Sequence, residues 1–299
     1  MVGGCAILRE ESSAPSSYLL RGANAPLPLP LKPEVNMVMP SFGHSGGLAF
    51  HPDGVLYFAN HLHLGTIGRF VVGKSDDPET FIDLREWMTS YGERIPHAQG
   101  IRLDAEGRLV VAEAGTGKII RISSESDKIE VLADSYDGTL LNSVWDVEID
   151  RNGFVYASVP DSGVIYSIRP AGGIVDILND ELVRVHGLAL SPEGDRLVAA
   201  EPDSGRVLVF DLEKGRLAAE MWTLVDFSPT GEEPVALAFD EFNRLFVGLG
   251  DAEKVQVFDL TRGSLIRTYE VGEPVSGLSY SDGTLFVSGG EAIQSISLR

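Results

Sequence analysis

The chain has 299 residues, and its 44 acidic against 24 basic side chains give a formal net charge of −20 at pH 7. Nucleic-acid binders need clustered Lys and Arg to replace counterions on phosphates, and the basic residues here are scattered singly, so the composition excludes most of that class. Anionic lipid would repel the same carboxylates, and no stretch approaches the roughly 18 apolar residues of a spanning helix. We therefore expect no membrane partner and a cytoplasmic location.

The first 33 residues form a segment rich in Ala, Ser and Pro. Proline has no backbone donor, so this composition predicts an extended arm (1–33) rather than a regular element. Residues 34–299 differ, with short β-branched and aromatic runs broken by small polar turns, and we expect them to form one domain. Helical spacing occurs only around Pro78–Tyr91, where we expect a short helix.

The β-rich part of the chain repeats one pattern six times: an apolar strand, a tight turn with an acidic residue or Gly, and a second apolar strand. The repeat starts lie 53, 46, 41, 49 and 41 residues apart. A period near 40–50 residues with about four strands per unit is typical of β-propeller blades, whereas a sandwich or solenoid is the alternative. The repeats begin at Gly47, Gly100, Asp146, Gly187, Ala236 and Gly277.

The ends of the chain complement each other. The last repeat contains only three strands, and an unassigned strand-like run, 34–39, precedes the first repeat. Pairing the N-terminal strand with the last blade removes two exposed strand edges. The sequence therefore predicts an all-β, six-bladed propeller of four-stranded antiparallel blades, closed by a strand at about 34–39.

A propeller brings two sets of loop residues to the mouth of its central channel. One set lies just before the innermost strands, and the other lies at the ends of the second strands. We expect one polar arc and one apolar arc at this mouth, which suits a small organic ligand. The first set is Gly46, Gln99, Trp145, His186, Val235 and Ser276, and the second is Asn60, Glu113, Val159, Glu201, Leu249 and Gly289.

Five of the six histidines fall near this face, and imidazoles beside carboxylates can serve as general bases or metal ligands. The alternative for each is a surface or capping role. Carboxylates at the mouth, including Asp161, favour neutral or cationic ligands and are expected to raise the protonation of nearby histidines. As catalytic candidates we take His186, Glu201, Glu113 and His97. As substrate-binding candidates we take Gln99, Trp145, Asn60, His44, His61, His63, Val235 and Ser276.

The two longest intervals place extra residues near 83–96 and 222–233. Both segments are expected at the mouth face, either as lids over a ligand or as covers for the ends of the blades.

Two motifs in the middle of the chain resemble those of a known family. Leu141–Val147 with Asp150–Gly153, and Val185–Gly194, are similar to the central motifs of the senescence-marker-protein/gluconolactonase/luciferin-regenerating-enzyme family, as are Leu109–Glu113 and Leu197–Glu201. The resemblance covers about residues 40–299. It implies a six-bladed propeller and, for most members, a lactonase or esterase that uses calcium, zinc or magnesium in the channel.

The metal ligands that the resemblance implies are absent here. In the family, a Glu of the first blade, an Asn of a Pro-Asn-Gly-type motif and an Asp of the fifth blade hold the metal, and an Asn of the third blade lies beside it. The usual calcium-type site is therefore expected to be lost, leaving no cofactor or one divalent metal bound by His186 with His97 or His44. The corresponding positions are Ser45 or Gly46, His186, Val235 and Trp145.

Three functions stay open at this point. The first is a divergent lactonase or esterase in which His186, aided by Glu201 or Glu113, moves a proton. The second is a metal-independent lyase or cyclase of a biosynthetic pathway, since residues 65–70 resemble the repeats of streptogramin-type lyases. The third is a non-catalytic propeller that binds a ligand or a protein partner, because the fold alone does not select a chemistry.

Overall fold

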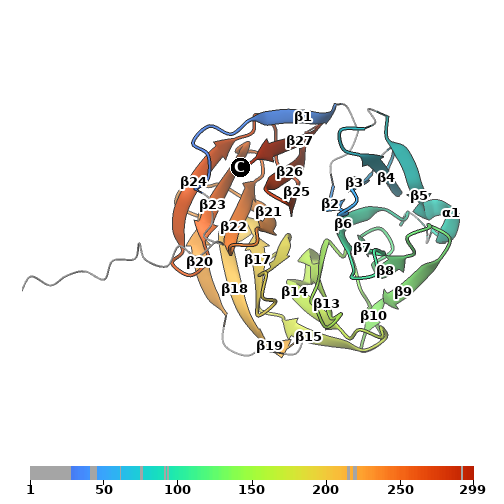
Figure 1. The fold of residues 1–299 in the computed structure, drawn as a ribbon. Coiled ribbons are helices and arrows are strands. Elements are labelled where there is room, and N and C mark those ends of the chain that lie inside the picture. The colour runs from blue at the N-terminus through green and yellow to red at the C-terminus, as the bar shows by residue number, and fades with distance from the viewer. Residues whose placement is uncertain are drawn as a thin grey trace, which may run out of the picture.

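The computed structural model describes residues 28–40, 46–60, 62–74, 77–90, 92, 94–213, 216–217, 221–290 and 292–299. Within these ranges the strands form six antiparallel blades arranged in a ring around a central channel (Figure 1). The predicted all-β, six-bladed propeller is confirmed.

The first three blades follow one another along the chain. Blade one consists of β2 (Leu48–Phe50), β3 (Val55–Ala59), β4 (Thr66–Val71) and β5 (Glu79–Asp83). Blade two consists of β6 (Ala98–Leu103), β7 (Leu109–Glu113), β8 (Lys118–Ile122) and β9 (Ile129–Ala133). A hairpin of β10 (Ser135–Tyr136) and β11 (Thr139–Leu140) leads to blade three, which consists of β12 (Asp146–Ile149), β13 (Val155–Val159), β14 (Val164–Ile168) and β15 (Val175–Asn179).

The second half of the ring repeats this order. Blade four consists of β16 (Leu188–Leu190), β17 (Arg196–Glu201), β18 (Arg206–Glu213) and β20 (Trp222–Asp226), with the short β19 (Arg216–Leu217) paired to β18. Blade five consists of β21 (Pro234–Phe239), β22 (Arg244–Leu249), β23 (Lys254–Asp259) and β24 (Ser264–Glu270). Blade six contains β25 (Gly277–Ser281), β26 (Thr284–Gly289) and β27 (Ala292–Ser297).

The N-terminal strand closes the ring. β1 (Val35–Pro40) pairs antiparallel with β27 and becomes the outermost strand of blade six, with Val35 opposite Ile296 and Met39 opposite Ile293 (Figure 1). The first strand of the domain thereby covers the edge that the last three strands leave open, as predicted from the sequence.

Part of the predicted arm packs on blade five, while residues 1–27 lie outside the described residues. Leu29 is buried in the core between blades five and six. The Tyr269 hydroxyl donates a hydrogen bond to the Pro30 carbonyl oxygen at 3.2 Å. The segment before β1 is therefore held by an apolar contact and a polar one.

The core consists of apolar layers between neighbouring blades. In the described part of the chain, each of the six blade-to-blade interfaces has its own buried cluster. Successive residues of a second strand serve different interfaces: Val111 packs toward blade one, whereas Val110 and Ala112 pack toward blade three. This is the period of two expected for strands that are buried on both faces.

Helices are few in the described residues. The helix expected around residues 78–91 is the single turn α1 (Leu84–Trp87), because Glu79–Asp83 extends as β5 instead. Single 3-10 turns, η1 (Pro160–Ser162) and η2 (Pro202–Ser204), follow the second strands of blades three and four. No helix in the described ranges has the length and apolar character needed to cross a bilayer.

The closing strand supplies a matched test of ring closure. Met39 is 5% exposed and packs between blades six and one, whereas Met37 on the same strand is 59% exposed. We expect Met39→Ala to lower the free energy of unfolding by about 2–4 kcal/mol because it leaves a cavity in this interface. Met37→Ala should change it little. Equal effects in denaturant unfolding would show that β1 does not close the ring.

Candidate functional site

Four predicted substrate-binding residues meet at the central channel. Gln99, Trp145, Val235 and Ser276 line one cavity, together with Arg102. Its volume is only ≈30 Å³. A cavity of this size holds about one water, not a lactone or an ester. The predicted gathering of these residues at the channel is therefore observed, but the space between them is too small for a substrate.

Trp145 and His186 form a stacked pair. Their ring centroids lie 4.5 Å apart with an interplanar angle of 23°. Nε2 of His186 is buried and has no hydrogen-bond partner among the described residues. Burial, and secondarily Arg184, lower the pKa of His186 to about 4, while Asp203 acts in the opposite direction. The expectation that acidic residues raise the protonation of this histidine is wrong, because desolvation is the larger effect.

Glu113 is fully buried and binds backbone amides. Its carboxylate accepts hydrogen bonds from the amides of His97 and Gly115, both at 2.9 Å, and from the amide and hydroxyl of Thr116. Glu113 therefore lies beside His97, but it holds the backbone of that histidine and not its ring. We assign it a positioning role.

Glu201 has the equivalent place in blade four. It is fully buried and accepts hydrogen bonds from the Val183 amide at 2.6 Å and from Nε of Arg206 at 2.7 Å. In the described part of the chain, neither Glu201 nor Glu113 hydrogen-bonds a histidine ring. The structure does not bring His186 and these carboxylates together as the sequence analysis expected, because backbone amides, the Thr116 hydroxyl and the Arg206 guanidinium take up their oxygens.

A larger pocket lies beside the channel mouth, where loops of blades one to three meet. It has a volume of ≈430 Å³, within the range of small-molecule sites. It is lined by Leu64, Arg94, Ile95, His97, Ala114, Gly115, Asn142, Ser143 and Asp161.

His97 is the titratable ring of this pocket. Its Nδ1 lies 3.4 Å from the Ile95 carbonyl oxygen. A proton on Nδ1 suits this contact and leaves the lone pair on Nε2. Gly115 permits the packing, since a Cβ there would lie 1.8 Å from the Ile95 oxygen and 2.9 Å from Nδ1 of His97.

The pocket also carries charge and backbone strain. Arg94 is exposed and forms no ion pair with any described residue, while Asp161 brings a carboxylate to the same wall. Ser143 has φ 51°, in the left-handed region that side chains other than Gly avoid. Strain of this kind is frequent at functional sites.

Sequence reasoning missed Arg94, Asn142 and Ser143. Two signals pointed to them. Arg94 and Ile95 belong to the first inserted segment, 83–96, which does reach the mouth pocket, and Asn142 and Ser143 belong to the motif 141–147 that carries the family resemblance. Residues 222–226 of the second insertion form the outermost strand of blade four and are not part of a lid.

Asn60 and His63, two further predicted substrate-binding residues, are not among the residues that line this pocket. Asn60 is buried with φ 61°, and its Oδ1 has no partner among the described residues. His63 contacts Arg85 through Nε2 and lies 3.9 Å from the Asp83 carboxylate. His44 and His61 fall outside the described residues.

The residues at the channel mouth do not fit a calcium-type site. Calcium takes six to eight oxygen ligands, yet Gly46, Val235 and Trp145 offer no side-chain oxygen and Trp145 is stacked on His186. Ser45, the alternative to Gly46 at the first position, lies outside the described residues. In the described ranges, no three His, Cys, Asp or Glu side chains are grouped to hold a metal ion. His186 and His97 therefore have no third ligand of these types there.

Comparison with known proteins identifies the family. The family model described as "SMP-30/Gluconolactonase/LRE-like region" matches residues 123–287, more than half of the chain. The chain therefore belongs to the SMP-30/gluconolactonase/LRE-like family, as its motifs indicated.

Individual relatives are distant. A curated gluconolactonase of Zymomonas mobilis is 26% identical over a 151-residue alignment that covers 45% of this chain and 42% of that protein, so the match spans less than half of the relative. A gluconolactonase structure from Xanthomonas campestris superposes with a TM-score of 0.76 at 20% identity, covering 89% of this chain and 90% of that one. A calcium-binding regucalcin from Agrobacterium tumefaciens gives 0.68 at 13%, covering 88% and 92%. At these identities the structures establish the fold.

The low pKa of His186 gives a pH prediction. An unfolded histidine titrates near 6.5, so between about pH 6.5 and 4 the unfolded chain binds more protons at this residue than the folded chain does. Acidification through this window should therefore destabilise the protein. His186→Phe, which keeps a ring against Trp145, should flatten the fall of the unfolding free energy, whereas His51→Gln on the opposite face should not. An NMR titration midpoint of His186 near 6.5 would contradict the assignment.

Proposed function

We propose that the chain hydrolyses a small neutral lactone, or a related ester, in the pocket beside the channel mouth. The observation that carries this proposal is the position of His97 on the wall of a ≈430 Å³ pocket that also contains Arg94, which forms no ion pair with any described residue. Membership of a family with gluconolactonases among its relatives supports a lactone as the substrate class.

In the proposed step, His97 acts as the general base. Nε2 of His97 takes a proton from water while the water oxygen bonds to the lactone carbonyl carbon. The ring C–O bond then breaks, and the imidazolium returns the proton to the departing ring oxygen. One lactone and one water give one hydroxy acid, with no other reactant.

Arg94 stabilises the charge that develops. A guanidinium in the pocket favours the oxyanion formed during attack and then the carboxylate of the product. Glu113 acts through the backbone: its hydrogen bond to the His97 amide, at 2.9 Å, fixes the end of the loop that carries the base, directly before β6. We therefore propose His97 and Arg94 as catalytic residues and Glu113 as a positioning residue. Compared with the sequence-based hypothesis, the base moves from His186 to His97.

The test is hydrolysis of a panel of sugar lactones and aryl esters, corrected for spontaneous hydrolysis. We expect His97→Gln to lower kcat by roughly 10²–10⁴-fold, the usual contribution of a general base. Arg94→Ala should also lower kcat. The control is His51→Gln, since His51 lies in a turn of the opposite face and its Nδ1 accepts a hydrogen bond from the Asp53 amide.

Three outcomes would overturn the proposal. If His97→Gln hydrolyses as fast as the wild type, the base is elsewhere. If lactones raise the melting temperature but are not hydrolysed, the pocket is a binding site and the non-catalytic alternative is correct. Elimination products without uptake of water would favour the lyase alternative.

A further inference from the structure

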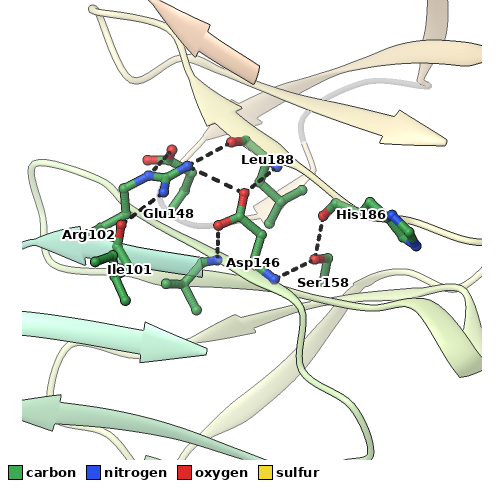
Figure 2. A network of polar contacts seen from close by, with 8 residues as sticks. Ile101, Arg102, Asp146, Glu148, Ser158, His186 and Leu188 are labelled. Carbon is green, nitrogen blue, oxygen red and sulfur yellow. Dashed lines mark hydrogen bonds and ion pairs between the residues drawn. The ribbon is translucent and has the colours of Figure 1, made fainter. Parts of the chain in front are cut away.

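The channel contains a largely buried cation that belongs to the chain itself. Arg102 extends from β6 of blade two toward blade three (Figure 2). Its Nε donates a hydrogen bond to Glu148 Oε1 at 2.6 Å, and Nη2 lies 3.4 Å from Asp146 Oδ2. Nη2 also donates to the Leu188 carbonyl oxygen of blade four at 3.2 Å, and Nη1 donates to the Ile101 carbonyl oxygen at 2.9 Å. One guanidinium thus joins three blades.

Asp146 carries the network toward the mouth. Its Oδ2 accepts the Leu188 amide of blade four at 2.9 Å. Its own amide donates to the Ser158 hydroxyl at 3.0 Å, and that hydroxyl donates to the His186 carbonyl oxygen at 2.6 Å (Figure 2). The contacts of Arg102 therefore continue to the backbone of the residue that stacks on Trp145.

Asp146 and Glu148 need a cation beside them. They are two residues apart on β12, so their side chains lie on the same face of the strand. The side chains of Arg102, Asp146 and Glu148 are only 19%, 11% and 15% exposed. Burial, and secondarily Asp146, raise the pKa of Glu148 to about 7, against the opposing effect of Arg102. Without Arg102, two desolvated carboxylates would lie side by side.

We propose that Arg102 is a permanent cation of the channel and takes the structural place of a bound metal ion. It holds blades two, three and four together and positions the Trp145–His186 pair. The disagreement between the channel residues and a calcium-type site supports this. The oxygens that could bind an ion there, from Asp146, Glu148 and Leu188, already bind the guanidinium. The ≈30 Å³ cavity beside Arg102 leaves room for about one water and not for a hydrated ion.

The proposal predicts a latent cation site that only removal of Arg102 exposes. Arg102→Ala should lower the melting temperature by roughly 5–15 °C, because it leaves two buried carboxylates unpaired. The vacated space would be lined by two carboxylates and a carbonyl oxygen, which are ligands that Ca²⁺ accepts. Millimolar CaCl₂ should therefore restore part of the lost melting temperature of this variant, whereas the wild type should melt alike in CaCl₂ and in EDTA.

The matched control is Arg69→Ala. Arg69 also forms an ion pair, with Glu79 at 2.7 Å, but these side chains are 38% and 66% exposed. Its loss should change the melting temperature little and create no response to CaCl₂. If Arg102→Ala does not fold, Arg102→Lys and Arg102→Met give the same comparison, and only the lysine variant should keep most of the stability.

The positioning role has its own readout. With Trp87→Phe and Trp222→Phe in place, fluorescence reports on Trp145 alone among the three tryptophans. In the folded protein, Arg102→Met should shift the Trp145 emission, and Arg102→Lys should restore it toward the starting value. The proposal fails if Arg102→Met is as stable as Arg102→Lys, if the wild type gains several degrees from CaCl₂ over EDTA, or if the Trp145 emission is the same in all three proteins.

Discussion

The close approach of the innermost strands at the channel is the constraint on which the rest of the molecule depends. The Gly100 amide donates to the Trp145 carbonyl oxygen of the next blade at 2.8 Å, and a Cβ on Gly100 would lie 2.0 Å from Asp146 Oδ1. The backbones of the innermost strands of blades two and three are therefore in direct contact at the channel, where a wider ring would leave space for a ligand. The pocket that His97 lines therefore lies where the loops diverge, beside the channel and not in it.

Polar contacts between blades follow from the same narrow geometry. Ser158 and Ser288 occupy equivalent places on the second strands of blades three and six. Each donates to the carbonyl oxygen of the residue two positions before the next blade's innermost strand. Between blades two and three, Arg102 reaches the carboxylates of Asp146 and Glu148 instead. Because hydrogen bonds and ion pairs are directional, they fix how adjacent blades meet more narrowly than the apolar layers do.

The sequence predicts the ring well because both of its signals are local. Strands with apolar residues at every second position and a repeat of 41–53 residues specify blades. Acidic residues in the turns accept hydrogen bonds from nearby backbone amides, as expected for turns: Asp150 accepts the amides of Asn152 and Phe154. The functional site is harder to predict from the sequence, because the role of a polar residue depends on its neighbours from other blades. The repeats place Glu113 at the mouth but do not show that three amides occupy its carboxylate, and Arg102 in a strand gives no sign that it points into the channel.

The charge of the chain bears on the proposed reaction through its product. A net charge of −20 produces a potential that disfavours anions at long range, so a neutral lactone approaches freely whereas a hydroxy-acid anion is repelled once it leaves the pocket. Arg94 acts at short range, where a single guanidinium can stabilise the developing negative charge before screening takes over. In the proposed step, local attraction during the reaction and global repulsion after it both favour turnover, because the first comes from Arg94 and the second from the net charge of the whole chain.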